Sequence, residues 1–382
     1  MRSDQMRILT MYLKIISSLR FGIQNIVPFF CLFVVVGFML MNSHFPGEST
    51  KVRLVNHHVV MKAKFHPRWN GTISWNLEEL FVKDVSKPSC CSLCSFVILI
   101  ISAPRNVEQR MAIRQTWCQP PNSSMHTGDW LGLKLDAGTR NVWGNRDHTS
   151  DSRRWQCVFL IGRTSDAKTE LAIQQEMETH KDILLGSYID TYRNLTLKVF
   201  HGFSWVHNSC KPNFVLKTDD DCFVNTALIY HLLTHSNNEL VKKKLYVGDI
   251  NLTLQKRIVL RHTASKWKVK KTEYNEPYYP PYASGLGYIL SADVIAEMLD
   301  ISKYFTPFPN EDAFVGMVLN FLGITPINSQ RFTSLPSGWT ICNFLYLLVI
   351  HNIAAASQKT LQNKTNLAPL MCKRQHFITT WN

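Results

Sequence analysis

The stretch Phe214-Val215-Leu216-Lys217-Thr218-Asp219-Asp220-Asp221 decides the fold class of this chain. It begins as a short apolar run, which predicts a strand buried on both faces, and it ends in three consecutive carboxylates. Ligands of open α/β sheets gather at the carboxyl ends of the strands, so the aspartates stand where a site is expected. Carboxylate oxygens are preferred ligands of Mg²⁺ and Mn²⁺. The competing interpretation of three adjacent aspartates is a solvated acidic turn.

The segments around this stretch alternate between strand and helix patterns. Short apolar runs predict strands at Phe96–Ile101, at Cys157–Ile161 and at residues 182–189. Spacing and composition predict helices at residues 106–117, 169–180 and 195–208. This alternation is typical of a mixed α/β domain with a mainly parallel sheet. Residues 120–154 are polar and lack a period, which predicts a long surface loop.

The composition excludes a mainly disordered chain. Of 382 residues, 45% are hydrophobic and 18% are charged, which suits one large domain or two small ones with appendages. The formal net charge of +14 favours anionic partners such as a nucleic acid, a membrane surface or a phosphate-bearing small molecule. The basic residues form no block and the sequence contains no nucleic-acid-binding motif, so we expect no nucleic acid partner.

The N-terminal region predicts a membrane anchor. Residues 21–47 contain no Asp, Glu, Lys or Arg, and Phe21–Met41 is long enough to cross a bilayer as a helix. Basic residues dominate the segment before it, which keeps the N-terminus cytoplasmic and translocates the rest. A cleaved signal peptide is the alternative, but no small-x-small cleavage site follows Met41. The predicted organisation is a tail at residues 1–20, an anchor at 21–41, a stem at 42–94 and a luminal domain at 95–382.

Cysteines and glycosylation sequons agree with a luminal location. Nine of the ten cysteines follow the predicted anchor; most should pair in an oxidising lumen, and an odd number leaves at least one unpaired. Cys91-x-x-Cys94 has no second pair at zinc spacing, so a disulfide is the preferred interpretation. Asn-x-Ser/Thr sequons predict N-glycosylation at Asn70, Asn122, Asn194, Asn251 and Asn363.

A second acidic pair, Glu311-Asp312, follows Asn310 and precedes an apolar stretch at residues 313–322. This is a helix-start pattern, and acidic residues at a helix N-terminus are commonly only caps. The alternative is a general base within reach of the metal site. His351 ends the apolar run Phe344–Ile350, where a structural histidine is more common than a metal ligand.

The segment Pro280–Tyr288 contains two prolines, two glycines and two tyrosines. This composition predicts a rigid turn that lets the backbone approach a ligand closely, and the tyrosine rings could stack on a sugar or a base. A plain loop is the alternative. The candidate pocket residues are Tyr282, Gly285 and Gly287.

Six motifs, in order and spacing, are similar to those of one protein family. They are RMAIRQTW at 110–117, FLIG at 159–162, DTYRNLTLK at 190–198, KTDDD at 217–221, YPPYASGLGY at 279–288 and EDAFVG at 311–316. On these motifs, about residues 95–372 resemble the animal β1,3-glycosyltransferases, the galactosyltransferase-type enzymes of the Golgi. The chain departs from the family pattern at Ala283, where a Cys is usual, and at Cys118 and Cys222, where other residues are usual.

The resemblance implies a nucleotide-sugar-binding fold of the GT-A kind, a UDP-sugar donor and a divalent metal, Mn²⁺ or Mg²⁺. It implies that Asp221, Asp219 and His351 bind the metal and that Asp312 is the catalytic base. It also implies that Arg110 and Arg114 reach the nucleotide or shape its pocket. The remaining residues implied at the donor are Lys217, Asp219 and Asp220, and Glu311 is added to the acceptor pocket.

The implied activity is an inverting transfer of a hexose, with galactose preferred, to the 3-hydroxyl of an acceptor glycan on a glycoprotein or glycolipid. The expected location is the Golgi membrane, as a single-pass type II protein whose catalytic domain is luminal. The alternatives are an N-acetylglucosaminyl- or N-acetylgalactosaminyltransferase on the same scaffold, or a non-catalytic glycan-binding ectodomain. An inactive copy need not keep Asp221, Asp312 and His351 together, whereas this chain has all three.

Overall fold

The computed structural model describes residues 84–91, 94–119, 155–235, 243–334, 339–372 and 381. All of them belong to one compact unit, Asn70–Asn382. The predicted anchor at residues 21–41 and the predicted loop at residues 120–154 lie outside the described residues. Within the described ranges, no helix is both long and apolar enough to span a bilayer.

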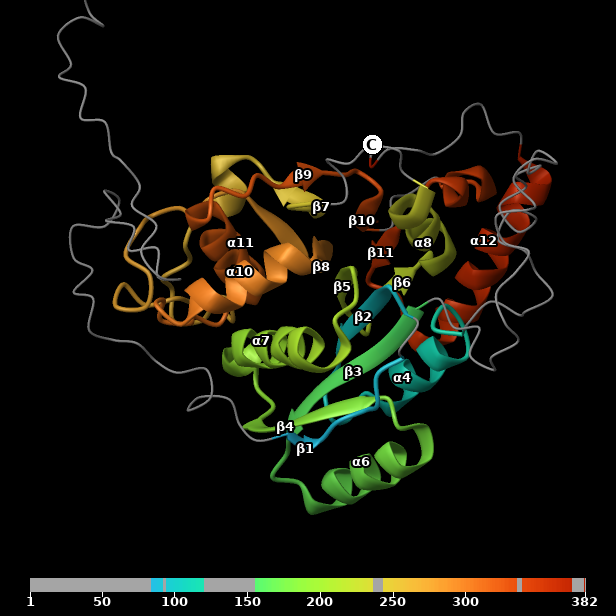
Figure 1. Ribbon diagram of the computed structural model, residues 1–382, viewed down its shortest axis with the longest axis horizontal. Helices are drawn as coiled ribbons and strands as arrows, with labels where there is room; N and C mark the ends of the chain where they lie inside the picture. The colour runs from blue at the N-terminus through green and yellow to red at the C-terminus, as the bar shows by residue number, and fades with distance from the viewer. Residues whose placement is uncertain are drawn as a thin grey trace, which may run out of the picture. The chain divides into compact units, whose positions relative to one another are not determined.

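An eight-stranded mixed sheet runs through this unit, in the order β1-β4-β3-β2-β5-β8-β7-β9 (Figure 1). The middle strands β4, β3, β2 and β5 are parallel, whereas β8 is antiparallel to both of its neighbours and β1 is antiparallel to β4. The predicted mixed, mainly parallel sheet is therefore confirmed. The strands are β1 (Asp84–Ser86), β2 (Phe96–Ile101), β3 (Trp155–Arg163), β4 (Ile183–Ile189), β5 (Phe214–Asp219), β7 (Tyr246–Asn251), β8 (Tyr282–Ser291) and β9 (Ile327–Asn328).

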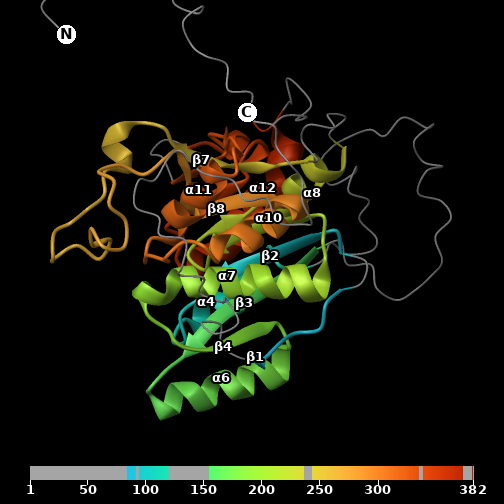
Figure 2. The ribbon, with the colours of Figure 1, turned by 60° about the vertical axis from the view of Figure 1, so that its left-hand side comes forward.

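Strand β2 lies in the middle of the core, and its residues alternate between two apolar clusters. Phe96, Ile98 and Ile100 pack on one face of the sheet, and Val97 and Leu99 pack on the other. Helices cover both faces, which explains why the strand is continuously apolar (Figure 2). The first cluster includes residues of α4 (Val107–Arg114), α6 (Ala167–His180), α8 (Thr226–His235) and α12 (Gln358–Met371). The second includes residues of α7 (Leu195–Trp205), α10 (Ala292–Ser302) and α11 (Glu311–Phe321).

A smaller sheet of three strands has the order β10-β11-β6. Its strands are β6 (Phe223–Val224), β10 (Phe332–Ser334) and β11 (Val349–His351). Strand β6 follows β5 after a short turn and pairs antiparallel with β11, which brings the end of β11 to that turn. The short helices are η3 (Tyr192–Asn194), η4 (Val206–Cys210), η5 (Leu254–Arg257), η6 (Ile341–Leu345) and η7 (Ala355–Ser357).

One predicted turn is a strand in the structure. Most of Pro280–Tyr288, predicted as a turn, is the first part of β8, because the backbone from Tyr282 onward pairs with neighbouring strands. A Cβ added at Gly287 would come within 3.3 Å of the Lys217 carbonyl oxygen, so this glycine serves strand packing. In the apolar run Phe344–Ile350, only the last two residues are strand, and the first two belong to η6.

Disulfides tie the chain together. The pairs are Cys90–Cys210, Cys91–Cys94, Cys118–Cys157 and Cys342–Cys372, and buried Cys222 is free. They confirm that Cys91 and Cys94 form a disulfide rather than a zinc site and that one cysteine among the described residues is unpaired, while the connectivity itself had not been predicted. Residues 84–91, predicted as stem, instead pack on the domain: β1 pairs with β4, and Asp84 Oδ1 lies 2.8 Å from His201 Nε2.

Candidate active site

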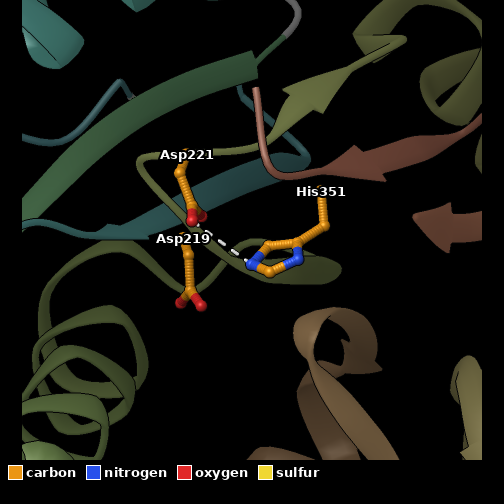
Figure 3. Close-up of side chains that lie close together, drawn as sticks. All are labelled: Asp219, Asp221 and His351. Carbon is orange, nitrogen blue, oxygen red and sulfur yellow. Dashed lines mark ion pairs between the residues drawn. The ribbon is translucent and has the colours of Figure 1, made fainter. Parts of the chain in front are cut away.

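Two carboxylates and one imidazole meet at the end of β5. Asp219 is the last residue of β5, Asp221 lies in the following turn, and His351 ends β11 (Figure 3). Ligand atoms from the three side chains all lie within 4.8 Å of one another. The Asp221 Oδ2 and His351 Nε2 atoms are 3.3 Å apart. All three residues are half-buried, so solvent and small ions can reach the cluster.

The pairing of β6 with β11 explains how these distant parts of the chain meet. The Ile353 N–H donates to the Asp221 carbonyl oxygen at 2.7 Å, which fixes the turn against the residues after β11. Burial alone would raise the pKa of Asp221, but its hydrogen bond and ion pair with His351 lower it below the ordinary value. The same hydrogen bond raises the pKa of His351. Carboxylate oxygens and an imidazole nitrogen form a donor set that suits a first-row divalent ion.

Asp220 is not part of this cluster and bonds instead to the loop between β2 and α4. Its Oδ2 accepts a hydrogen bond from Asn106 Nδ2 at 2.9 Å, and its N–H donates to the Ile101 carbonyl oxygen at 3.0 Å. Burial raises the pKa of its carboxyl above the ordinary value. Asn106 thus lies at the carboxyl edge of the parallel strands, where ligands of such sheets bind. The sequence patterns did not single it out; its only signal was its place between a buried strand and a helix.

Asp312 lies in the first turn of α11 and faces the start of β8. Its Oδ2 accepts from the Gly285 N–H at 3.1 Å, and its Oδ1 accepts from the Ala313 N–H at 2.8 Å. A Cβ added at Gly285 would lie 3.3 Å from that Oδ2, so a glycine here admits the close approach. Burial raises the pKa of Asp312 despite the opposing charge of Lys217. A half-buried carboxylate with a raised pKa has the properties of a general base.

Lys217 and Glu311 form a buried ion pair that joins the two parts of the site. Lys217 Nζ donates to Asp219 Oδ1 at 2.9 Å, to the Gly285 carbonyl oxygen at 2.6 Å and to Glu311 Oε1 at 2.5 Å. The other Glu311 oxygen accepts from the Tyr288 hydroxyl at 2.9 Å. Burial raises the pKa of Glu311 to about 7, while Lys217 opposes the rise. All three ammonium hydrogens and both carboxylate oxygens therefore have protein partners. The contacts of Lys217 with the donor and of Glu311 with the acceptor stay predictions.

The two arginines expected to reach the nucleotide or to shape its pocket form ion pairs with acidic residues in and after α6. Arg114 bonds to Asp182 at 2.8 Å and to Glu176 at 2.7 Å, and Arg110 bonds to Glu176 through two nitrogens at 2.8 and 2.6 Å. The remaining N–H groups of Arg110 donate to Ser102 Oγ and to the carbonyl oxygens of Ala103 and Pro104. A contact of Arg110 with the donor stays a prediction, and in this structure the side chain is fully buried. It shapes the site by fixing the loop after β2.

The predicted pocket residues of β8 divide into two groups. Gly285 lies at the site, next to Asp312, whereas Gly287 packs against β5. Tyr282 packs on α11, where a Cβ added at Gly316 would come within 2.2 Å of the Tyr282 Cβ. Its half-buried ring leaves a contact with sugar as a prediction.

Tyr192 in η3 is a further neighbour of the site. Burial raises the pKa of its hydroxyl, and the carboxylates of Asp312 and Glu311 raise it further. The hydroxyl therefore lies within the electrostatic field of the candidate base. Tyr192 belongs to one of the six motifs, but nothing in the sequence assigned it a function.

Three of the five sequon asparagines lie within the described residues. Asn363 is exposed and Asn251 is half-buried. The Asn194 Nδ2, the atom that a glycan would occupy, donates to the Ile189 carbonyl oxygen at 2.8 Å. Asn194 therefore has a structural role at the start of α7, while Asn70 and Asn122 lie outside the described residues.

Comparison with known proteins gives matches to one family. The family model described as "Galactosyltransferase" matches residues 137–330. Beta-1,3-galactosyltransferase 5 of Pan troglodytes is 32% identical over 262 residues, which cover 67% of this chain and 77% of that protein. Beta-1,3-galactosyltransferase 1 of Mus musculus is 29% identical over 283 residues, which cover 73% of this chain and 77% of that protein.

Comparison with solved structures gives weaker likenesses. The galactosyltransferase LgtC, solved with donor and acceptor sugar analogs, aligns at 9% identity and a TM-score of 0.35, over 70% of this chain and 95% of that chain. The WbbM bifunctional glycosyltransferase aligns at 10% identity and a TM-score of 0.32, over 75% of this chain and 52% of that chain.

Proposed function

Because the chain belongs to the galactosyltransferase family of UDP-sugar glycosyltransferases, we propose that it transfers galactose from UDP-galactose to the 3-hydroxyl of an acceptor glycan in β linkage. The named relatives are β-1,3-galactosyltransferases, which supports this donor and this linkage. The observation that carries the proposal is the presence of two separate acidic sites. In one, Asp219 and Asp221 lie beside His351. In the other, Asp312 faces the backbone of Gly285.

The stereochemistry requires one base. The hexose of a UDP-hexose is α-linked and the proposed product is β-linked, so a single in-line displacement inverts the anomeric carbon. Asp312 is placed to accept the proton of the attacking hydroxyl, because its carboxylate is half-buried and burial raises its pKa. The N–H groups of Gly285 and Ala313 hold the two oxygens of this carboxylate in position.

The residues at the end of β5 fit a divalent metal. Asp219, Asp221 and His351 would hold it, since their ligand atoms converge and all three side chains are accessible. When bound, such an ion, Mn²⁺ or Mg²⁺, neutralises negative charge on the departing diphosphate.

Lys217 links the end of β5, which carries the candidate metal ligand Asp219, to the start of α11, which carries the candidate base. Its ammonium is bonded to Asp219 on one side and to Glu311, the neighbour of Asp312, on the other. The buried charge of Glu311 is thereby compensated, and α11 is held against the end of β5. We assign Lys217 and Glu311 as positioning residues.

The proposed location is the Golgi lumen, with residues 21–41 as the membrane anchor. Four disulfides among the described residues support an oxidising compartment. An N-acetylhexosaminyltransferase on the same scaffold is the second candidate, because the catalytic groups described above do not depend on the group at C2 of the sugar.

A donor screen tests the proposal. The full-length chain in detergent is given UDP-galactose, UDP-N-acetylglucosamine, UDP-N-acetylgalactosamine or UDP-glucose with pooled glycan acceptors, in Mn²⁺ or EDTA. We expect acceptor-stimulated release of UDP from UDP-galactose in Mn²⁺ and none in EDTA. Release from an N-acetylhexosamine donor alone would favour the second candidate. A folded chain that releases no UDP and binds no UDP would contradict the transferase assignment.

A further inference from the structure

The segment between β7 and β8, residues 252–281, carries exposed aromatic and basic side chains next to α11. We propose that three residues, Tyr192, Lys266 and Trp267, form an acceptor shelf that binds the acceptor glycan and favours acceptors carrying an anionic group. The inference rests on the proposed transferase activity and adds the chemical class of its acceptor.

Direct contacts join the three shelf residues to one another and to the residue before α11. Lys266 Nζ lies 4.7 Å from the centroid of the Trp267 ring and 5.9 Å from that of the Tyr192 ring. The Trp267 carbonyl oxygen accepts a hydrogen bond from Asn310 Nδ2 at 3.3 Å, and Asn310 precedes the helix that carries Asp312. The backbone of Trp267 is therefore tied to the residue that precedes α11, the helix whose first turn carries Asp312.

A second connection comes from η3. Arg193 forms an ion pair with Glu273, which ties η3 to residues 252–281. Tyr192 is the residue before Arg193, and the negative charge of Asp312 contributes to raising the pKa of the Tyr192 hydroxyl. The shelf thus connects η3 with residues 252–281.

The Trp267 ring suits the apolar face of a sugar. The residue is 48% exposed although its carbonyl oxygen is hydrogen-bonded to Asn310, so the ring faces solvent from an anchored backbone. Aromatic side chains supply large, rigid contact area for ligands that are apolar on one face and polar at the edge. A hexose ring has this character, and its hydroxyls would then reach toward Asp312.

The charge of the segment favours an anionic acceptor. Residues 252–281 contain seven Lys and Arg against two Glu, which gives 7 − 2 = +5. Both arginines are used inside the segment: Arg257 donates to the carbonyl oxygens of Tyr279 and Leu252, and Arg261 to those of Val269 and Glu276. The lysines extend from this frame, and no described carboxylate forms an ion pair with Lys266. A sulfate ester or a carboxylate on the acceptor would supply that partner.

An anionic lipid surface is the competing partner for this charge. Exposed Leu252 and Leu254 lie on the same segment, and basic residues with apolar neighbours also suit a bilayer. We favour the glycan because Lys266 and Trp267, rather than these leucines, are tied to the residues around Asp312.

Binding of three probes tests the shelf. The neutral probe is benzyl β-N-acetylglucosaminide. The sulfated probe is its 6-sulfate, and the carboxylate probe is the disaccharide of N-acetylglucosamine on glucuronic acid. The set distinguishes a preference for sulfate from a preference for carboxylate. Calorimetry uses the full-length chain in detergent with UDP and Mn²⁺. The variants are Lys266→Gln, Trp267→Ala and Trp267→Phe. The matched controls are Lys168→Gln and Leu171→Ala, both at exposed positions on α6.

We expect the wild type to bind at least one anionic probe more tightly than the neutral one. Lys266→Gln should lower the affinity for the anionic probe about two- to fivefold, which is the range of an exposed ion pair. The affinity for the neutral probe should not change. Trp267→Ala should weaken all bound probes about tenfold, with recovery in Trp267→Phe. The affinity for UDP should not change in any variant.

Two results would overturn the shelf. One is equal affinity of the wild type for neutral and anionic probes, or no binding of any probe. The other is loss of binding to phosphatidylserine-containing vesicles in Lys266→Gln with glycan binding intact, which would assign the charge to a lipid surface. Failure of the proposed function is a separate result, since it would appear as no turnover of any UDP-sugar by the wild type.

Discussion

Replacing Arg110 with Met should destabilise the domain strongly and leave UDP binding intact. Arg110 is fully buried, and its five N–H groups bond to Glu176, Ser102, Ala103 and Pro104. Removing one partner of a buried ion pair costs about 3–5 kcal/mol, because the other charge stays buried. The loss is not larger here because Arg114 still bonds to Glu176 at 2.7 Å.

The magnitude translates into a measurable shift. At about 2–4 °C per kcal/mol for a domain of this size, the expected fall in Tm is about 6–20 °C. Arg105→Met is the matched control, because the Arg105 side chain is 77% exposed and lies 3.8 Å from Asp166. An exposed pair of this kind contributes about 0–1 kcal/mol. Thermal unfolding and calorimetric titration of UDP are measured on both full-length variants.

One outcome would refute this reasoning. If Arg110→Met unfolds at the wild-type temperature but loses UDP affinity, the guanidinium contacts the donor and its bonds to Glu176 do not describe its function. A fall in Tm with UDP affinity unchanged, and no effect of Arg105→Met, is the expected pattern.

Three further predictions follow from the site and its surroundings. His351→Ala should weaken Mn²⁺ binding by at least about tenfold, as even outer-shell changes do, whereas exposed His262→Ala should not; equal affinities in a metal titration would remove His351 from the ligand set. Glu311→Gln in the Lys217→Met background should cost less stability than in the wild type, with a coupling of about 0.5–3 kcal/mol in denaturant unfolding; additive losses would show that the pair is not coupled. Burial lowers the pKa of His201 although Asp84 opposes the shift, so the folded protein favours the neutral imidazole. The stability that the neutral imidazole contributes is complete above the ordinary histidine pKa of about 6.5. It is lost as the pH falls below that value, because the unfolded chain then binds the proton more readily. Unfolding at pH 7 and pH 5.5 should therefore show a smaller difference in His201→Gln than in the wild type, and an unchanged difference would contradict this.

The sequence predicted the sheet well because its strands are buried on both faces. A run such as Phe96–Ile101 has no polar residue to break the pattern, and its predicted bounds agree with those of β2. The turn predicted at Pro280–Tyr288 was wrong because glycines in a central strand look the same as glycines in a turn. Only the pairing of β8 with β5 shows that Gly287 serves strand packing.

The sequence indicated which residues belong to the candidate metal site, but not which side chains bond to one another around it. Three aspartates at a strand end indicated a metal site, and the structure places Asp219 and Asp221 beside His351. The family resemblance implied substrate contacts for Arg110, Lys217 and Glu311, and in the structure all three side chains are buried and have partners within the protein. Long-range partners, Glu176 for Arg110 and Glu311 for Lys217, hold these side chains, and no local pattern reveals them.

The most direct test of the central claim is the activity of Asp312→Asn with UDP-galactose and Mn²⁺. The amide keeps the shape of the side chain but cannot accept the proton, so turnover should fall about 10²–10⁴-fold while UDP affinity is unchanged. Asp300→Asn, at an exposed position on α10, is the control and should retain full activity. Wild-type turnover should give a β-linked product. Turnover of Asp312→Asn close to the wild-type rate, or an α-linked product, would contradict the account.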